Sequence, residues 1–139
     1  MKFTLTIDGN KYTATYTGYT ARLWREQFRT DLLLTLTEAN AKIISACGAA
    51  DMSLMSDDMF TGLCVESITP ELLEKIAWAL LATTAHDNGE DFPLYEHWLD
   101  SVENYNEMLY VAITGFHYMM GNVPVESSKA PQTQKKTLA

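Results

Sequence analysis

Few residues of this 139-residue chain are suited to chemistry, and the first candidates are His86 and Asp87. An adjacent histidine and aspartate are both able to bind a divalent metal, which would suit metal-dependent hydrolysis of a phosphate ester. Such a site needs another histidine well upstream, and the sequence has none before position 86. The pair is therefore interpreted as part of a polar segment rather than as metal ligands.

The acidic segment 87–91 offers carboxylate and amide oxygens, which are the ligands that a hard cation prefers. It lacks the alternating ligands and the final bidentate glutamate of an EF-hand loop, so a solvated loop is the favoured interpretation. The remaining histidines, His97 and His117, fall on different expected helices. We expect His97 to be exposed and His117 to be partly packed.

Nucleophiles are also scarce. The only cysteines, Cys47 and Cys64, form no C-x-x-C pair and have apolar neighbours, so they are interpreted as small buried residues in a reducing compartment. The chain contains no G-x-S-x-G, S-x-x-K or G-x-x-x-x-G-K motif. We therefore expect no catalytic residues, no cofactor site and no metal site, and a protein that is not an enzyme.

Composition indicates one folded domain. Hydrophobic residues make up 47% of the chain and charged residues 20%, as in typical globular proteins. We assign the domain to residues 1–122 and expect a flexible C-terminal tail over 123–139, which is rich in Ser, Lys, Gln, Thr and Pro. No apolar run reaches the roughly 18 residues of a membrane span, and the start lacks the apolar block of a signal peptide. The expected location is the cytoplasm.

Negative charge is concentrated in one part of the chain. The net charge is −8, but residues 51–107 contain thirteen Asp or Glu residues and a single basic residue, Lys75. Such a surface repels phosphate backbones, so neither nucleic acid nor a membrane is an expected partner. It would attract a basic protein. The alternative, that the acidic surface only keeps the protein soluble, is left open.

The N-terminal sequence predicts a β-hairpin. Apolar and polar residues alternate over 3–7 and 12–16, and the Asp8-Gly9 step between them suits a tight turn. Because a two-stranded hairpin is not stable alone, it must pack on the rest of the chain. Threonines are expected at most outward positions: Thr4, Thr6, Thr13, Thr15 and Thr17.

A helical pattern begins directly after the hairpin. Thr20 is the expected N-cap of a helix in which Trp24, Phe28 and Leu32 recur every fourth residue. Another helix is expected over 38–50.

A strong helix start follows at Thr69, with Pro70 at the first helical position and Glu71 near the positive end of the helix dipole. This helix is apolar around most of its girth, so we expect it at the centre of the core. Its expected buried residues are Leu72, Leu73, Ile76, Ala77, Leu80 and Leu81, with Trp78 beside them.

Two further helices complete the expected fold. One begins near position 92 and places Leu94, Trp98 and Val102 on one face, and the other covers about 105–120. The residues that the last helix is expected to bury are Tyr105, Met108, Leu109, Ala112, Phe116 and Met119. The sequence thus predicts a mainly α protein with a small N-terminal β-hairpin (α+β), in which the hairpin packs on a compact bundle of about four to five helices.

Three methionines within eight residues suggest a surface that binds a partner. Methionine side chains are flexible and polarisable, so they adapt to many apolar shapes. Nearby aspartates would surround the surface with negative charge, which suits a basic amphipathic helix. The candidate partner-binding residues are Met52, Met55, Asp57, Asp58, Met59 and Phe60. The alternative, that the methionines fill gaps beneath a loop, is left open.

The order of these features resembles tail assembly chaperones of long-tailed (siphovirus-type) phages and prophages of Gram-positive bacteria. The resemblance spans roughly residues 1–120. It rests on the segments KFTLTIDG (2–9), TARLWREQF (20–28), DLL (31–33), WALL (78–81) and DFPLYEHWL (91–99).

Proteins of this family bind the tape measure protein while tail tube subunits polymerise around it, and they are absent from the finished virion. The resemblance implies a non-enzymatic chaperone that solubilises the tape measure protein and helps recruit tail tube subunits in the host cytoplasm. It also implies a homo-oligomer, and it transfers no position-specific residues. Two alternatives are a structural adaptor or tail-completion protein of a phage particle, and a small regulatory protein-binding module.

Overall fold

The computed structural model describes residues 2–7, 10–47, 56, 59, 62 and 66–121. The described part is predominantly helical, with one two-stranded antiparallel hairpin packed against helices, so the predicted fold class is confirmed. In chain order the elements are β1 (Lys2–Ile7), β2 (Asn10–Thr15), α1 (Gly18–Phe28), α2 (Leu32–Cys47), α4 (Pro70–Asp87), α5 (Tyr95–Ser101) and α6 (Tyr105–Met119).

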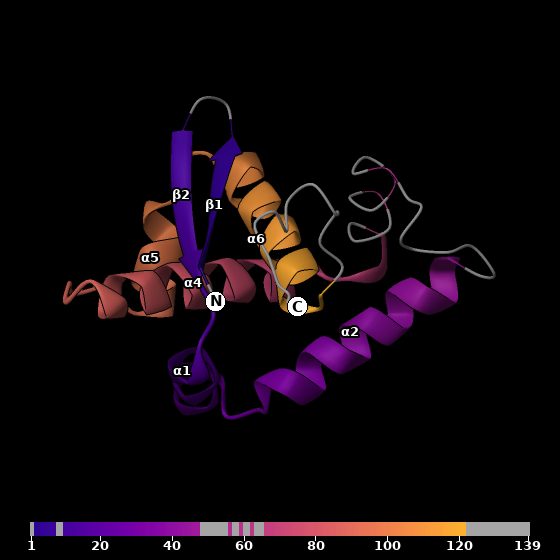
Figure 1. Ribbon diagram of the computed structural model, residues 1–139, viewed down its shortest axis with the longest axis horizontal. Coiled ribbons are helices and arrows are strands. Elements are labelled where there is room, and N and C mark those ends of the chain that lie inside the picture. Colours follow the sequence, from indigo (N-terminus) through magenta and orange to yellow (C-terminus); the bar gives the residue numbers. More distant parts are fainter. Residues whose placement is uncertain are drawn as a thin grey trace, which may run out of the picture.

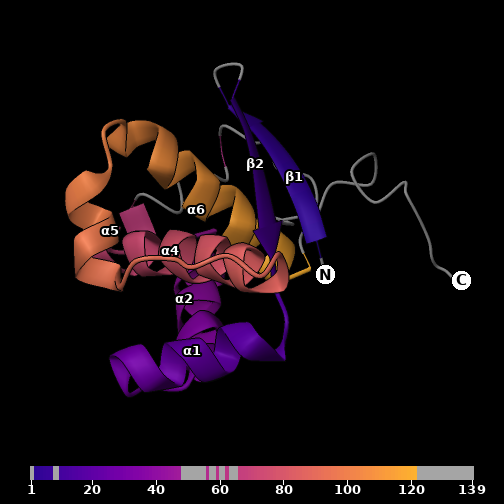
Figure 2. The ribbon, with the colours of Figure 1, turned by 90° about the vertical axis from the view of Figure 1, so that its left-hand side faces the viewer.

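Helix α4 lies between two groups of elements (Figure 1). The hairpin and α6 lie on one side of α4, and α1 and α2 lie on the other, as Figure 2 also shows. Helix α4 contacts α6, β2, α1 and α5, and β1 in turn contacts α6. The prediction that this helix occupies the centre of the core is confirmed.

The start and the middle of α4 follow directly from its sequence. Thr69 is the N-cap and accepts a hydrogen bond from the Leu72 N–H, and Pro70 occupies the first turn. The five consecutive residues from Ile76 to Leu80 are each at most 2% exposed. Because successive residues of a helix point about 100° apart, burial of five in a row means that α4 is surrounded on all sides.

At the pairs nearest the start of the hairpin, burial alternates with the sequence. Phe3 is paired with Ala14 and both are buried, whereas the next pair, Thr4 and Thr13, is exposed. The Phe3 ring also stacks on Tyr118 of α6, with 4.3 Å between ring centroids. The hairpin therefore obtains from α6 the cover that a two-stranded sheet needs.

Threonine hydroxyls connect the hairpin and α1 to α4. The Thr84 hydroxyl lies 2.9 Å from that of Thr15 and donates to the Thr13 carbonyl, and the Thr20 and Thr83 hydroxyls are 2.7 Å apart. The expectation that Thr15 faces outward is therefore wrong, since it is buried against α4. Each hydroxyl has a hydrogen-bond partner, which offsets the loss of hydration.

Helix α1 begins earlier than the sequence analysis predicts. Its N-cap is Thr17 rather than Thr20, and the Thr17 side chain accepts a hydrogen bond from the Tyr19 N–H. Thr20 instead accepts from the Thr17 N–H and so completes a capping box. Either threonine is chemically suited to be the cap, and the packing of Thr20 against Thr83 decides between them.

The expected stripe of Trp24, Phe28 and Leu32 is divided between two helices. Helix α1 ends at Phe28 because Arg29 adopts a left-handed conformation with φ of 60°. Leu32 then opens α2, where Asp31 accepts a hydrogen bond from the Leu34 N–H. The helix expected over 38–50 corresponds, as far as residue 47, to the second part of this longer helix, and residues 48–50 lie outside the described part of the chain.

The C-terminal helices differ from expectation at their first residues. Helix α5 begins at Tyr95, which is buried, rather than near position 92, and Leu94 precedes the helix and is 61% exposed. The Pro93 carbonyl accepts a hydrogen bond from Trp78 Nε1, which holds the segment before α5 against α4. Tyr105 is likewise exposed at the start of α6, because its hydroxyl reaches a surface carboxylate rather than the core.

Some predictions fall outside the described residues. They concern Cys64, the side chain of Cys47 and the tail over 123–139. The proposed domain boundary at residue 122 also stays a prediction.

Replacing Gly115 with alanine should destabilise the fold. The added Cβ would lie 2.4 Å from Leu80 Cδ1, and Leu80 is fully buried in α4. Such overpacking costs about 1–3 kcal/mol, which the better helix propensity of alanine offsets by up to about 1 kcal/mol. Urea unfolding should therefore show a free energy of unfolding lowered by about 1–2 kcal/mol.

Gly18→Ala is the matched control, because a Cβ at this helical position meets no atom within 4 Å. It should leave the free energy of unfolding unchanged or raise it by less than about 1 kcal/mol. Equal stability of the two variants would contradict the close packing of α6 on α4.

Candidate functional site

His86 and Asp87 both contact the N-terminal region of the chain. The His86 ring stacks on Tyr19 with 3.7 Å between centroids, and Asp87 Oδ2 lies 2.7 Å from Lys2 Nζ. The hydrogen bond from Lys2 is the main cause that lowers the pKa of Asp87. These contacts join the end of α4 to α1 and β1. Within the described ranges, no group of three or more His, Cys, Asp or Glu residues is placed to hold a metal ion.

The predicted methionine surface is described only at Met59. This residue is 58% exposed, and its N–H donates a hydrogen bond to Ser56 Oγ. Met59 therefore does not fill a gap beneath a loop. The other candidate residues lie outside the described part of the chain: Met52, Met55, Asp57, Asp58 and Phe60. Their grouping with Met59 stays a prediction.

A larger apolar surface lies on α2, and the sequence analysis missed it. One side of this helix is buried in the core through Leu32, Leu36, Ala39 and Ile43. A neighbouring side is exposed and carries no charged residue. We call it the α2 outer face, and its residues are Leu33, Leu34, Thr37, Ala41 and Ile44.

The large side chains of the α2 outer face are well exposed. Leu33 is 64% exposed, Leu34 58% and Ile44 50%. Leu33 and Ile44 are eleven residues apart, which is about three helical turns, so they lie on one line along the helix. Transfer of such a side chain from water to an apolar contact is worth about 1.5–3 kcal/mol when burial is complete. Apolar surface of this kind marks sites of protein interaction.

The signal that could have revealed this face is the run of leucines from Leu32 to Leu34. Consecutive residues of a helix point about 100° apart, so three leucines in succession cannot all face one side. In a helix that packs on the core through a single stripe, some of them must be exposed. The stripe of Trp24, Phe28 and Leu32 takes up only the first of these leucines.

Carboxylates dominate the other described surface. Residues 66–121 contain ten Asp or Glu residues but only one basic residue, Lys75. Lys75 Nζ lies 3.4 Å from Glu71 and 4.9 Å from the centroid of the Phe28 ring. All of these acidic residues except Glu74 and Glu107 are exposed. Helices α4 and α5 and the loops that follow them therefore present a negatively charged surface, whereas the one acidic residue of α6, Glu107, is buried.

Glu74 connects three helices through tyrosine hydroxyls. It lies on α4 and accepts hydrogen bonds from Tyr95 of α5 (3.2 Å) and from Tyr105 of α6 (2.5 Å). The hydrogen bond to Glu74 is the main cause that raises the pKa of Tyr105 to about 12. The pKa of Tyr95 is also raised, first by burial and then by the charge of Glu74.

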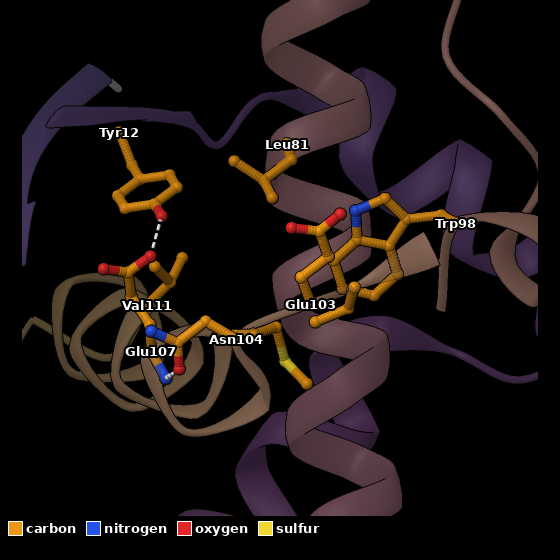
Figure 3. Close-up of a pocket in the computed structure, with 9 residues that line it drawn as sticks. Tyr12, Leu81, Trp98, Glu103, Asn104, Glu107 and Val111 are labelled. Atoms are coloured by element: carbon orange, nitrogen blue, oxygen red, sulfur yellow. Dashed lines mark hydrogen bonds between the residues drawn. The ribbon is translucent and has the colours of Figure 1, made fainter. Parts of the chain in front are cut away.

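A cavity of about 390 Å³ lies where β2, α4, α5 and α6 meet (Figure 3). It combines two carboxyl groups, an indole ring, a phenol and aliphatic side chains. The lining residues are Tyr12, Leu81, Trp98, Val102, Glu103, Asn104, Glu107, Met108 and Val111. Tyr12 and Glu107 are joined by a hydrogen bond, although they are far apart in the sequence.

Comparisons of the chain with protein-family models, with curated proteins and with solved structures gave no match. Across the described part of the chain, no helix is both long enough and apolar enough to cross a membrane. A function must therefore be inferred from the sequence and from the surfaces described above.

Glu74→Gln should lower the pKa of Tyr105 from about 12 toward its ordinary value near 10, because the variant removes the negative charge that the hydroxyl faces. Because the pKa of Tyr105 is higher in the folded protein than in the unfolded chain, its hydrogen bond stabilises the folded state below about pH 10. This stabilisation is lost as the pH rises through the folded-state pKa of about 12. Tyrosinate absorbance in the near ultraviolet, followed against pH, measures the titration.

The difference between each protein and its Tyr105→Phe counterpart isolates the Tyr105 signal. Glu90→Gln is the matched control, because Glu90 is an exposed carboxylate in the loop after α4. An unchanged Tyr105 titration in Glu74→Gln would contradict the assigned hydrogen bond.

Proposed function

We propose that this protein is a tail assembly chaperone of a long-tailed phage or prophage. It binds the tape measure protein through exposed apolar helix surface, keeps that protein soluble, and helps recruit tail tube subunits in the host cytoplasm. It performs no catalysis, and it self-associates. The sequence resemblance supports the family, and the α2 outer face is the observation that carries the binding role.

The α2 outer face suits an apolar stripe on a client helix. Leu33 and Ile44 are separated by about 16 Å along the helix axis, so the face offers a docking line of about three turns. Thr37 and Ala41 lie between them and are small, which allows another helix to approach closely. Met59, in the segment after α2, is a further exposed apolar side chain, and its flexibility lets it adapt to the shape of a client.

Charge favours a basic client. The acidic surface of α4, α5 and the loops that follow them would steer a lysine-rich helix toward the protein and would repel acidic chains. The α2 outer face itself has no charge, so a client helix can bury its apolar stripe there without leaving a carboxylate unpaired. The client that suits both the α2 outer face and the acidic surface is an amphipathic helix with an apolar stripe and basic flanks.

A chaperone of a long client needs only weak binding at each site. One short helical docking line gives modest affinity, and repeated binding along a long helical protein multiplies it. Weak individual contacts also allow tail tube subunits to displace the chaperone as they polymerise.

The double variant Leu33→Ser, Ile44→Ser should lose client binding while keeping its fold. Both side chains are half or more exposed, so their replacement should change the free energy of unfolding by at most about 0.5 kcal/mol each. Loss of two apolar contacts should weaken binding by about tenfold or more. Co-expression with the tape measure protein, followed by measurement of its soluble fraction, tests this outcome.

Leu94→Ser, Tyr110→Ser is the matched control, because these residues are as exposed as the α2 pair but lie outside α2. It should leave the soluble fraction of the tape measure protein unchanged. If the wild-type chain does not solubilise that protein, the proposed function is wrong. If both variants solubilise it equally well, the α2 outer face is not the binding site.

A further inference from the structure

The cavity lined by Glu103 and Glu107 is a second candidate site, and it differs in chemistry from the α2 outer face. Its lining residues come from β2, α4, α5, α6 and the segment before α6. Figure 2 shows that the hairpin and α6 lie on the side of α4 away from α1 and α2. Its volume of about 390 Å³ falls within the range of small-ligand sites in proteins.

Glu107 provides a buried carboxyl group at one wall of the cavity. The residue is only 6% exposed, and the Tyr12 hydroxyl donates a hydrogen bond to its Oε1. The Glu107 N–H donates to Asn104 Oδ1 at 3.0 Å, which fixes this position in the first turn of α6. Figure 3 shows the Glu107 carboxyl directed toward Tyr12. A carboxyl group held in this way is a fixed hydrogen-bond acceptor beside the cavity.

Glu103 adds a second carboxyl group about one turn earlier in the chain, and it is exposed. The remaining walls are mainly apolar. Trp98 supplies an indole ring, and the aliphatic surface comes from Leu81, Val102, Met108 and Val111. The cavity therefore pairs acceptor groups with an apolar and aromatic lining.

This combination selects for a cation on an apolar stem. None of the nine lining residues is basic, so an anionic ligand would meet two carboxyl groups and no positive charge. A neutral apolar ligand would cover the exposed Glu103 carboxylate without bringing a positive charge to it. An ammonium group forms charge-assisted hydrogen bonds with carboxylates and is attracted to an aromatic face, while its methylene groups pack on aliphatic walls.

We propose that this cavity binds an ammonium group carried on an alkyl chain. A lysine side chain of the helical client is the occupant that the proposed function supplies, and this part of the inference rests on that function. A free protonated diamine has the same chemistry and is the other source. In the first case the cavity binds one lysine of the client, on a segment of the client separate from the apolar stripe that the α2 outer face binds.

An NMR titration of the full chain tests the proposal through the indole N–H signal of Trp98, which a Trp98→Phe variant assigns. The probes are Nα-acetyl-lysine methylamide, its norleucine counterpart and cadaverine. The lysine amide and cadaverine should shift the Trp98 signal saturably. The norleucine amide, which keeps the alkyl chain but lacks the ammonium, should bind about tenfold more weakly or worse. Equal shifts with the norleucine amide would overturn the proposal.

Carboxylate variants provide the second test. Glu103→Gln should weaken ammonium binding by about threefold to tenfold. This variant is preferred to Glu107→Gln because Glu103 is exposed, so its replacement should leave the fold intact, whereas Glu107 is buried. Glu90→Gln, outside the cavity, is the matched control and should bind like the wild type. Identical titrations of Glu103→Gln and Glu90→Gln would overturn the proposal.

The source of the ammonium group is tested with a basic helical peptide from the tape measure protein and with the same peptide carrying norleucine for lysine. If the lysine peptide binds more tightly than cadaverine, the result supports a lysine side chain of the client as the occupant of the cavity. If cadaverine binds more tightly, the client lysine is ruled out as the occupant in favour of a free amine. Failure here is distinguishable from failure of the proposed function. Normal ammonium binding without client solubilisation refutes only the function, and solubilisation without ammonium binding refutes only the cavity proposal.

Discussion

Burial of α4 on all sides is the constraint on which the rest of the described structure depends. The residues from Ile76 to Leu80 leave this helix no polar side, so other elements must surround it. The hairpin and α6 cover it from one direction and α1 from another, and α5 closes a further side. The polar contacts follow from this arrangement. Threonine hydroxyls, the Trp78 indole N–H and the Glu74 carboxylate each join α4 to an element that covers it.

Helix α2 is the exception to this close packing, and that difference suggests where a partner binds. It joins the core through one stripe of four residues and leaves its outer face exposed. Helices α4 and α5 have the opposite character, since carboxylates stand among their exposed side chains and their apolar residues are mostly buried. Apolar docking surface and negative charge thus belong to different parts of the fold. A client with an apolar stripe and basic flanks is the kind of partner that uses both.

Local signals predicted the fold well, and long-range contacts account for what they missed. Alternation in the hairpin and the Thr69-Pro70 start of α4 depend on neighbouring residues, and both were predicted correctly. The break at Arg29 was missed, because a left-handed arginine is not a residue type that marks a helix end. Of the predicted partner-binding residues, only Met59 belongs to the described part of the chain, and its binding role stays a prediction. The cavity was missed because Tyr12 and Glu107 meet across 95 positions, and no pattern within one helix or strand records that pairing.

Hydrogen–deuterium exchange tests most directly whether the α2 outer face is the docking surface. A helix packed through one stripe opens locally at lower free energy than a fully surrounded one, so residues 32–47 should exchange faster than 73–85 in the free protein. Addition of a basic amphipathic segment of the tape measure protein should slow exchange across 32–47 and leave 73–85 unchanged. Unchanged exchange in α2, with protection confined to α5 and α6, would contradict docking at the α2 outer face.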